Sequence, residues 1–175
     1  MNELDKNFIE AWFPRGLVKN GSDVLSSQVS GEGLCPLRIS WDSGKITRIE
    51  GIKGESNLPS KFLLPRLLEP HAHIDKAFTW NKCPNLEGTY KGALKANFKE
   101  HKIRTAEKVR IRAERALNIA LRNGLRAIRT HVDSFGLSGQ QTLETILDLK
   151  REWAPFIQLQ FVSPVPLEYW NSGEG

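Results

Sequence analysis

The sequence predicts an α/β fold in which a small β-rich module precedes alternating strands and helices. Two observations support this prediction. Turn residues separate short strand candidates throughout residues 1–64, and beyond them the hydrophobic pattern switches between the periods of strands and of amphipathic helices. A chain of 175 residues can form one sizeable core, or one domain with a smaller one. We therefore expect two domains, a small β-sandwich-like module of residues 1–64 and a larger α/β part of residues 65–175.

The β-rich module contains one clear hairpin. Residues 37–41 and 45–50 both alternate apolar and polar side chains with a period of two, as half-buried strands do. The segment Asp42-Ser43-Gly44 lies between them and is typical of a tight turn. These residues predict two antiparallel neighbours.

The second part begins with an apolar run, residues 62–71, that predicts a strand. A long polar loop follows to about residue 104, with a short helix inside 92–102. The next helix has Thr105 as its N-cap and Asn123-Gly124 as its stop signal. The remaining predicted elements are a strand at 125–132, a helix opened by a capping box at 138–141, and a strand at 156–162.

Strands that alternate with helices predict βαβ units and a parallel sheet with right-handed connections. The order found here is that of the first three strands of a (β/α)8 TIM-type barrel, so we expect a partial barrel. A complete barrel takes about 250 residues, far more than follow residue 64. We therefore expect a truncated barrel. Its open sheet would expose the inward face of Leu67, Ile128 and Leu159, so that the chain would aggregate or pair with a partner chain.

Two histidines, His71 and His73, stand at the end of the first predicted barrel strand. Residues i and i+2 of a strand point to the same face, so both imidazoles converge on one point. Imidazole nitrogen is a preferred ligand of zinc and similar metals. Asp75 falls on the same row if the strand continues. A chance pair of histidines is the alternative interpretation of so short a pattern.

The residues around this pair resemble a known family. The run Pro70-His71-Ala72-His73-Ile74-Asp75-Lys76 after a hydrophobic strand resembles the amidohydrolase superfamily, and Glu69 with Asp75-Lys76 resembles its cytosine-deaminase-like branch. Residues 129–133 and 153–162 resemble the ends of the second and third strands of that branch. The three blocks occur in the order that the family has, over nearly the whole chain.

The resemblance implies a metal-dependent hydrolase that acts on C–N bonds other than peptide bonds. Deamination, or amide or ring-amine hydrolysis, of a small N-heterocyclic substrate would be the reaction. His71 and His73 would hold a divalent metal, zinc or iron, and no organic cofactor is implied. The metal would lower the pKa of a bound water toward ~7, and a carboxylate would move the proton to the leaving amine.

Four further residues are pocket candidates, and each has an ordinary alternative. Asp75, Lys76 and Asp133 could orient groups at the pocket mouth, or form exposed salt bridges or caps. His131 ends a predicted strand and could serve catalysis or make a structural hydrogen bond. His101 lies in a polar run, and we expect it to be exposed.

The departures from the family bear on activity. Arg66 follows Pro65 where the family has glycine, and residues 164–167 lack the glutamine with which cytosine deaminases read their ring. The family's later histidines, glutamate and aspartate have no counterpart here. We therefore expect the isolated chain to bind metal weakly and to be inactive. The alternative function is a catalytically inactive fragment or interaction module that requires a partner chain.

The composition narrows the remaining classes. The net charge is +5 with a pI near 9.3, and basic residues collect between Lys99 and Arg129. We interpret them as the solvated face of a helix; a basic nucleic-acid-binding domain is the weaker alternative, because aromatic residues are not interleaved there. No apolar run approaches the ~20 residues of a membrane span. Two distant cysteines, Cys35 and Cys83, indicate free thiols and a cytoplasmic location.

Overall fold

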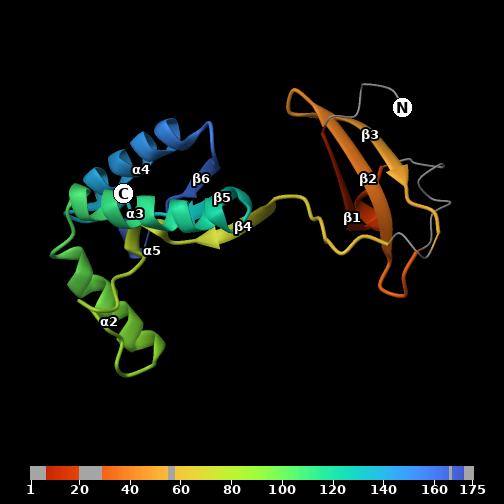
Figure 1. Cartoon of the computed structure of the whole chain (residues 1–175). Helices are drawn as coiled ribbons and strands as arrows, with labels where there is room; N and C mark the ends of the chain where they lie inside the picture. The colour runs from red at the N-terminus through yellow and green to blue at the C-terminus, as the bar shows by residue number, and fades with distance from the viewer. Residues whose placement is uncertain (1–6, 20–28, 55–57, 166, 172–175) are drawn as a thin grey trace. The chain divides into compact units, whose positions relative to one another are not determined.

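The computed structural model describes residues 7–19, 29–54, 58–165 and 167–171. The chain divides into two compact units, Met1–Pro65 and Arg66–Gly175 (Figure 1). Both strands and helices occur in it, as the predicted α/β class requires.

The first unit contains an antiparallel sheet of strands β1 (Phe8–Pro14), β2 (Leu34–Asp42) and β3 (Lys45–Gly51), in that order. A short 3-10 helix, η1 (Arg15–Leu17), follows β1. The predicted hairpin is confirmed, because β2 and β3 pair antiparallel around Ser43 and Gly44. Both turn residues have positive φ angles, 48° and 75°, which is the conformation that two-residue hairpin loops require.

Strand β1 was not predicted from the sequence, although it pairs with β2 along its whole length. Strand β1 also contacts the start of the apolar run at 62–71, which was predicted as one strand. Phe62 forms an isolated bridge with Trp12, supported by a hydrogen bond from the Leu63 amide to the Trp12 carbonyl of 2.9 Å. The expected strand is therefore wrong at its start, because β1 binds residues 61–63.

The second unit contains a parallel sheet with strand order β4 (Leu67–Ala72), β5 (Leu125–His131) and β6 (Gln158–Val162). Its parallel pairing is as predicted. The helical elements of this unit are η3 (Ile74–Lys76), α2 (Tyr90–His101), α3 (Ala106–Arg122), α4 (Gly139–Trp153) and α5 (Leu167–Trp170).

Local signals predicted helix α3 well and the start of α4 poorly. The Thr105 side chain accepts a hydrogen bond from the Lys108 amide at 3.3 Å, and Gly124 after the helix has a φ angle of 81°. The predicted capping box at 138–141 is wrong. Ser138 occupies the N-cap position of α4, but its side chain makes no capping hydrogen bond.

Helices α3 and α4 pack on one face of the parallel sheet (Figure 1), and the core of this unit lies between them. Leu117 of α3 and Ile146 of α4 are fully buried there. Ile128 of β5 and Leu159 of β6 belong to the same cluster, and each is 3% exposed. The expectation that Ile128 and Leu159 would meet water is therefore wrong, because both side chains point toward the helices. Leu67 is exposed as expected, at 53%.

Polar groups occupy part of the opposite face of the sheet. Arg129 of β5 is exposed and donates two hydrogen bonds, of 3.1 and 2.9 Å, to the Gln160 side-chain oxygen on β6. This pair spans two neighbouring strands, so this face of the sheet carries hydrophilic groups as well as apolar ones.

The described part of the chain contains no helix with the length and apolar character needed to cross a bilayer. Cys35 and Cys83 are buried free thiols, as predicted. Burial raises the pKa of the Cys35 thiol, which keeps it protonated and poorly reactive.

The core predicts the effect of one truncation in α3. Leu117→Ala should lower the free energy of unfolding by about 2–5 kcal/mol, because it leaves a cavity in a fully buried site. Urea denaturation followed by circular dichroism measures this change. Ile119→Ala on the same helix is the control: Ile119 is 45% exposed, and its truncation should cost less than about 1 kcal/mol. Equal losses in both variants would contradict the assignment of the core.

Candidate functional site

The two histidines predicted as metal ligands lie together at the end of β4. The Nε2 atoms of His71 and His73 are 3.4 Å apart. Two nitrogens bound to one tetrahedral zinc ion at about 2.0–2.1 Å would be separated by about 3.3–3.4 Å. The pair therefore has the spacing of two ligands of a single cation, and these donor atoms fit a divalent metal.

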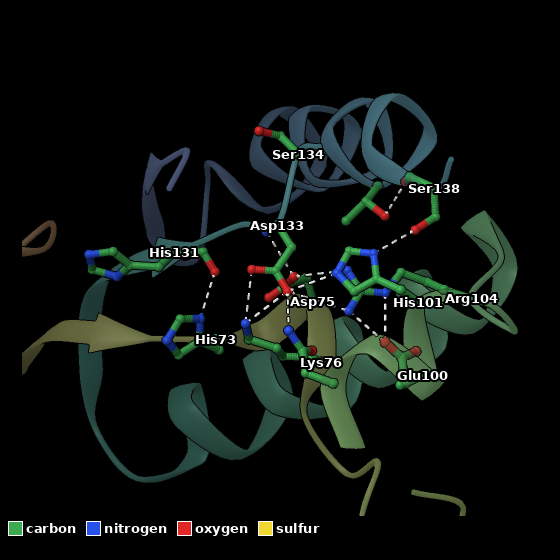
Figure 2. A network of polar contacts seen from close by, with 12 residues as sticks. His73, Asp75, Lys76, Glu100, His101, Arg104, His131, Asp133, Ser134 and Ser138 are labelled. Carbon is green, nitrogen blue, oxygen red and sulfur yellow. Dashed lines mark hydrogen bonds and ion pairs between the residues drawn. The ribbon is translucent and has the colours of Figure 1, made fainter. Parts of the chain in front are cut away.

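A backbone contact fixes the orientation of the His73 ring. Its Nδ1 lies 2.9 Å from the His131 carbonyl oxygen (Figure 2), so Nδ1–H donates and Nε2 carries the lone pair of the neutral ring, on the side of His71. Burial, and then the positive charge of Lys76, lower the pKa of His73, so the neutral form is favoured. Metal-binding histidines are commonly held by such a contact to a carbonyl oxygen.

His131 stands beside the pair without joining it. Its ring stacks on that of His71, with centroids 3.9 Å apart and an interplanar angle of 19°. Its Nδ1 is buried and has no hydrogen-bond partner within the described structure. No group of three or more His, Cys, Asp and Glu side chains among the described residues is arranged to hold a metal ion. Among the described residues, two side chains, His71 and His73, are therefore spaced as ligands of one cation.

A polar network centred on Asp133 lies next to this pair (Figure 2). The Lys76 ammonium donates to both carboxylate oxygens, at 2.9 and 2.8 Å. Asn97 Nδ2 and His101 Nε2 each lie 3.1 Å from Oδ2. Burial alone would raise the pKa of the Asp133 carboxyl, but the hydrogen bonds from His101 and Lys76 outweigh it and hold the pKa far below its usual range. Asp133 is therefore ionised.

Asp75 does not share the row of the two histidines. The chain leaves the extended conformation after Ala72 and forms the 3-10 helix η3, which turns Asp75 into the interior. Its Oδ2 accepts from the Asp133 amide at 3.2 Å and lies 3.5 Å from Arg104 Nη1. Burial, and then the negative charge of Asp133, raise the pKa of Asp75. Asp75 is thus a buried partner in the network.

Several members of this network were not predicted from the sequence. The expectation that His101 is exposed is wrong, because only 12% of its side chain is accessible and its Nδ1 lies 3.1 Å from the Ser138 hydroxyl. The Ser138 hydroxyl makes this contact to His101 instead of capping the start of α4, which explains the absent capping hydrogen bond. Asn97 and His101 are four residues apart and lie on one face of α2, so helical spacing was the available signal for these two.

Two arginines of the basic region are also part of the interior. Arg104 has no exposed side-chain surface, and its Nη2 lies 2.5 Å from Glu100 Oε2. Arg112 Nη1 lies 2.6 Å from the other Glu100 oxygen. Burial alone would raise the pKa of Glu100, but the hydrogen bonds from both guanidinium groups lower it. The interpretation of this region as a solvated face is therefore wrong for these two residues.

Comparison with known proteins gives relatives that are named as a deaminase and an amidohydrolase. No family model matches the chain. Pterin deaminase of Rhizobium rhizogenes (strain K84 / ATCC BAA-868) is 32% identical over 106 residues, which are 60% of this chain and 24% of that protein. N-isopropylammelide isopropyl amidohydrolase of Pseudomonas sp. (strain ADP) is 26% identical over 122 residues, 66% of this chain and 30% of that protein. The chain thus matches only 24% and 30% of the lengths of these two curated relatives.

Solved structures give the same picture. 5-Methylcytosine deaminase from Klebsiella pneumoniae, liganded with 5-fluorocytosine, matches with a TM-score of 0.62 and 25% identity over 74% of this chain and 33% of that chain. N-isopropylammelide isopropylaminohydrolase from Burkholderia multivorans ATCC 17616 matches with a TM-score of 0.51 and 18% identity over 88% of this chain and 37% of that chain. The second likeness concerns the fold alone.

The network predicts a pH-dependent loss of stability in Asp133→Asn. The variant should unfold more easily by at least about 2 kcal/mol at pH 7, because it leaves Lys76 without its buried counter-charge. The folded pKa of Asp133 lies below its ordinary 3.8, so this stabilisation is present above that pH and is lost as pH falls through the lower folded value. The difference between the proteins should therefore shrink only below about pH 4.

Urea denaturation at a series of pH values measures the effect. Asp148→Asn is the matched control, because Asp148 pairs with Arg151 on the surface, where both side chains are about half exposed or more. Its loss should change the free energy of unfolding by less than about 1 kcal/mol. A pH-independent difference for Asp133→Asn would contradict the assignment.

Proposed function

We propose that this chain is part of a metal-dependent hydrolase, because its relatives point to the amidohydrolase superfamily over the part of the chain that they cover. The reaction is the hydrolysis of a C–N bond, by deamination or removal of an amine, on a small N-heterocyclic substrate. The observation that carries the proposal is the pair of Nε2 atoms of His71 and His73, 3.4 Å apart, with one ring fixed by a carbonyl contact.

Each residue has a defined task in this proposal. His71 and His73 hold the cation, zinc or iron, and the His131 carbonyl keeps His73 in the tautomer that presents Nε2. When bound, such a metal supplies Lewis acidity that makes water acidic near neutral pH. Burial, and then the positive charge of Lys76, which Asp133 holds nearby, lower the pKa of His73 and favour its neutral ring. His131 stacks on His71 and limits the motion of its ring.

We propose for the fold that the parallel sheet forms the first three strands of a (β/α)8 barrel, and that residues 1–64 form a separate small β domain. The order β4-β5-β6, the parallel pairing and the helices on one face support it. In this arrangement β4 and β6 are edge strands, each with one paired neighbour among the described residues. We propose that a partner chain, or a second copy of this chain, covers these edges and adds metal ligands.

Metal binding tests the histidine pair directly. Zinc added to the nitrogen-labelled chain should shift the imidazole signals of His71 and His73, and either His→Ala substitution should weaken zinc binding at least tenfold, roughly the loss seen when a metal site loses a supporting group. His101→Gln is the control, because His101 contacts Asp133 and Ser138 and lies outside the pair. Equal zinc affinity in all four proteins would refute the assignment.

Activity tests the proposed reaction. The chain is expressed with an affinity tag in the organism from which it comes, so that it is purified together with any partner. Amine release by the purified material is then measured from pterin, 5-methylcytosine and N-isopropylammelide. We expect release from at least one compound, lost on treatment with a chelator and in the His71→Ala/His73→Ala double variant. Release that survives both treatments would contradict a metal-dependent mechanism. Light scattering on the same material reports whether a second chain is present.

A further inference from the structure

A cavity of about 560 Å³ opens beside His73 in the second unit. It lies between the segment that follows β4 and helix α2, and two members of the Asp133 network, Lys76 and Asn97, form part of its wall. Its walls include His73 and Lys76 on one side, Phe78 and Trp80 from the following loop, and Tyr90 and Asn97 from α2. Cavities of this size, largely apolar with a few polar groups, are typical of small-molecule sites.

Aromatic side chains with much accessible surface gather around this cavity. Phe78 is 49% exposed, Trp80 60% and Tyr90 80%. Three such side chains on one cavity offer flat apolar surface that water covers poorly, and a flat ring is the shape that stacks on them. The aromatic character of the wall therefore favours a planar ligand.

The backbone of Phe78 gives a second, independent indication. Its φ angle is 58°, in the left-handed region that bulky residues rarely adopt. Such a conformation costs about 1–3 kcal/mol and persists where the surroundings hold it, often at ligand sites. Here the Arg115 guanidinium lies over the Phe78 ring, 4.3 Å from its centroid. Phe78 is thus held in place in the cavity wall.

The polar wall has donors and acceptors in fixed positions. Asn97 donates its side-chain N–H to Asp133, and within the described structure its side-chain oxygen makes no hydrogen bond. That oxygen can accept from an amine or ring N–H of a ligand. Lys76 is held by the same carboxylate. The Asp133 network therefore fixes two polar groups at the cavity edge beside a proposed metal ligand.

We propose that this cavity binds the ring of a planar, nitrogen-containing heteroaromatic compound. The ring stacks on Trp80, with Phe78 and Tyr90 as further walls, and its N–H groups donate to the Asn97 oxygen. The inference deepens the proposed function, on which it rests, because it names the residues that select the substrate ring. Trp80, Tyr90 and Asn97 are the residues that determine specificity.

The test is ligand binding to the metal-free chain, measured without turnover. Pterin is titrated into protein labelled with nitrogen-15. The NMR signals of the indole N–H groups of the protein's five tryptophans are followed during the titration. The signal absent from a Trp80→Phe variant identifies Trp80. We expect this signal to shift, while that of Trp153, which packs against the core, stays in place.

Substitutions then test the stacking. Trp80→Ala should weaken pterin binding about tenfold, within the range for loss of one aromatic–base stack, while Trp80→Phe retains most of the affinity. Tyr90→Ala should weaken binding as well, and its 80% exposure makes it safe for the fold. Phe156→Ala is the matched control: Phe156 is 55% exposed and lies outside the cavity. A saturated ring amine, cyclohexylamine, has no flat ring face to stack and should not shift the Trp80 signal.

Two outcomes would overturn the inference: a Trp80 signal that pterin does not move, or equal pterin affinity in the Trp80→Ala, Tyr90→Ala and Phe156→Ala variants. The His71→Ala/His73→Ala variant separates this inference from the proposed function. It should still bind pterin at Trp80, because the stacking walls do not include the metal. Pterin binding without amine release by the recovered material supports the cavity and contradicts the hydrolase. Amine release by that material without a shift of the Trp80 signal supports the hydrolase and contradicts the cavity inference.

Discussion

The carboxylate of Asp133 is the constraint on which the second unit depends. Asp133 follows strand β5, and it binds Lys76 of η3 together with Asn97 and His101 of α2. Three segments that are distant in sequence thus meet at one buried group. A buried carboxylate is costly unless several donors satisfy it, so the donors and the carboxylate determine one another's positions. This contact holds the connection between β4 and α3 over the end of the sheet.

The charges around Asp133 balance, which makes their burial tolerable. The network contains as many carboxylates as cations, namely Asp75, Glu100 and Asp133 with Lys76, Arg104 and Arg112. The two aspartates differ because their neighbours are unequal. Most donors go to Asp133, whose pKa falls, whereas Oδ1 of Asp75 has no hydrogen-bond partner in the described structure and its pKa rises. Neighbouring carboxyl groups with pKa values pushed apart are common where proton transfer occurs.

The sequence predicted those features whose causes lie within a few residues. The turn at Ser43-Gly44, the cap at Thr105 and the helix stop at Gly124 depend on local backbone geometry, and all three occur as predicted. Ser138 shows the limit of such signals, because a tertiary partner, His101, takes the hydroxyl that a capping box would use. Lys76 and Asp133 are 57 residues apart, and one sequence contains no information that pairs them in advance.

In the candidate site too, the features with local causes could be predicted from the sequence and those with distant causes could not. His71 and His73 could be predicted as neighbours because strand geometry alone brings residues i and i+2 to one face. Asp75 could not be placed, since the course of the chain after His73 depends on distant groups: the Ile74 amide donates to Thr130 Oγ1 at 3.2 Å, and the Ile74 side chain is 3% exposed in the core.

That turn at Ile74 has two consequences. It directs Asp75 inward to support the network, and it sends the following loop back past His73, where Phe78 and Trp80 line the cavity. The strand places the two imidazoles, and the turn that follows it places the aromatic wall of the cavity beside them. A change that weakens the Asp133 network should therefore act first on Lys76 and Asn97, whereas His73 and Phe78 keep their own contacts to the His131 carbonyl and the Arg115 guanidinium.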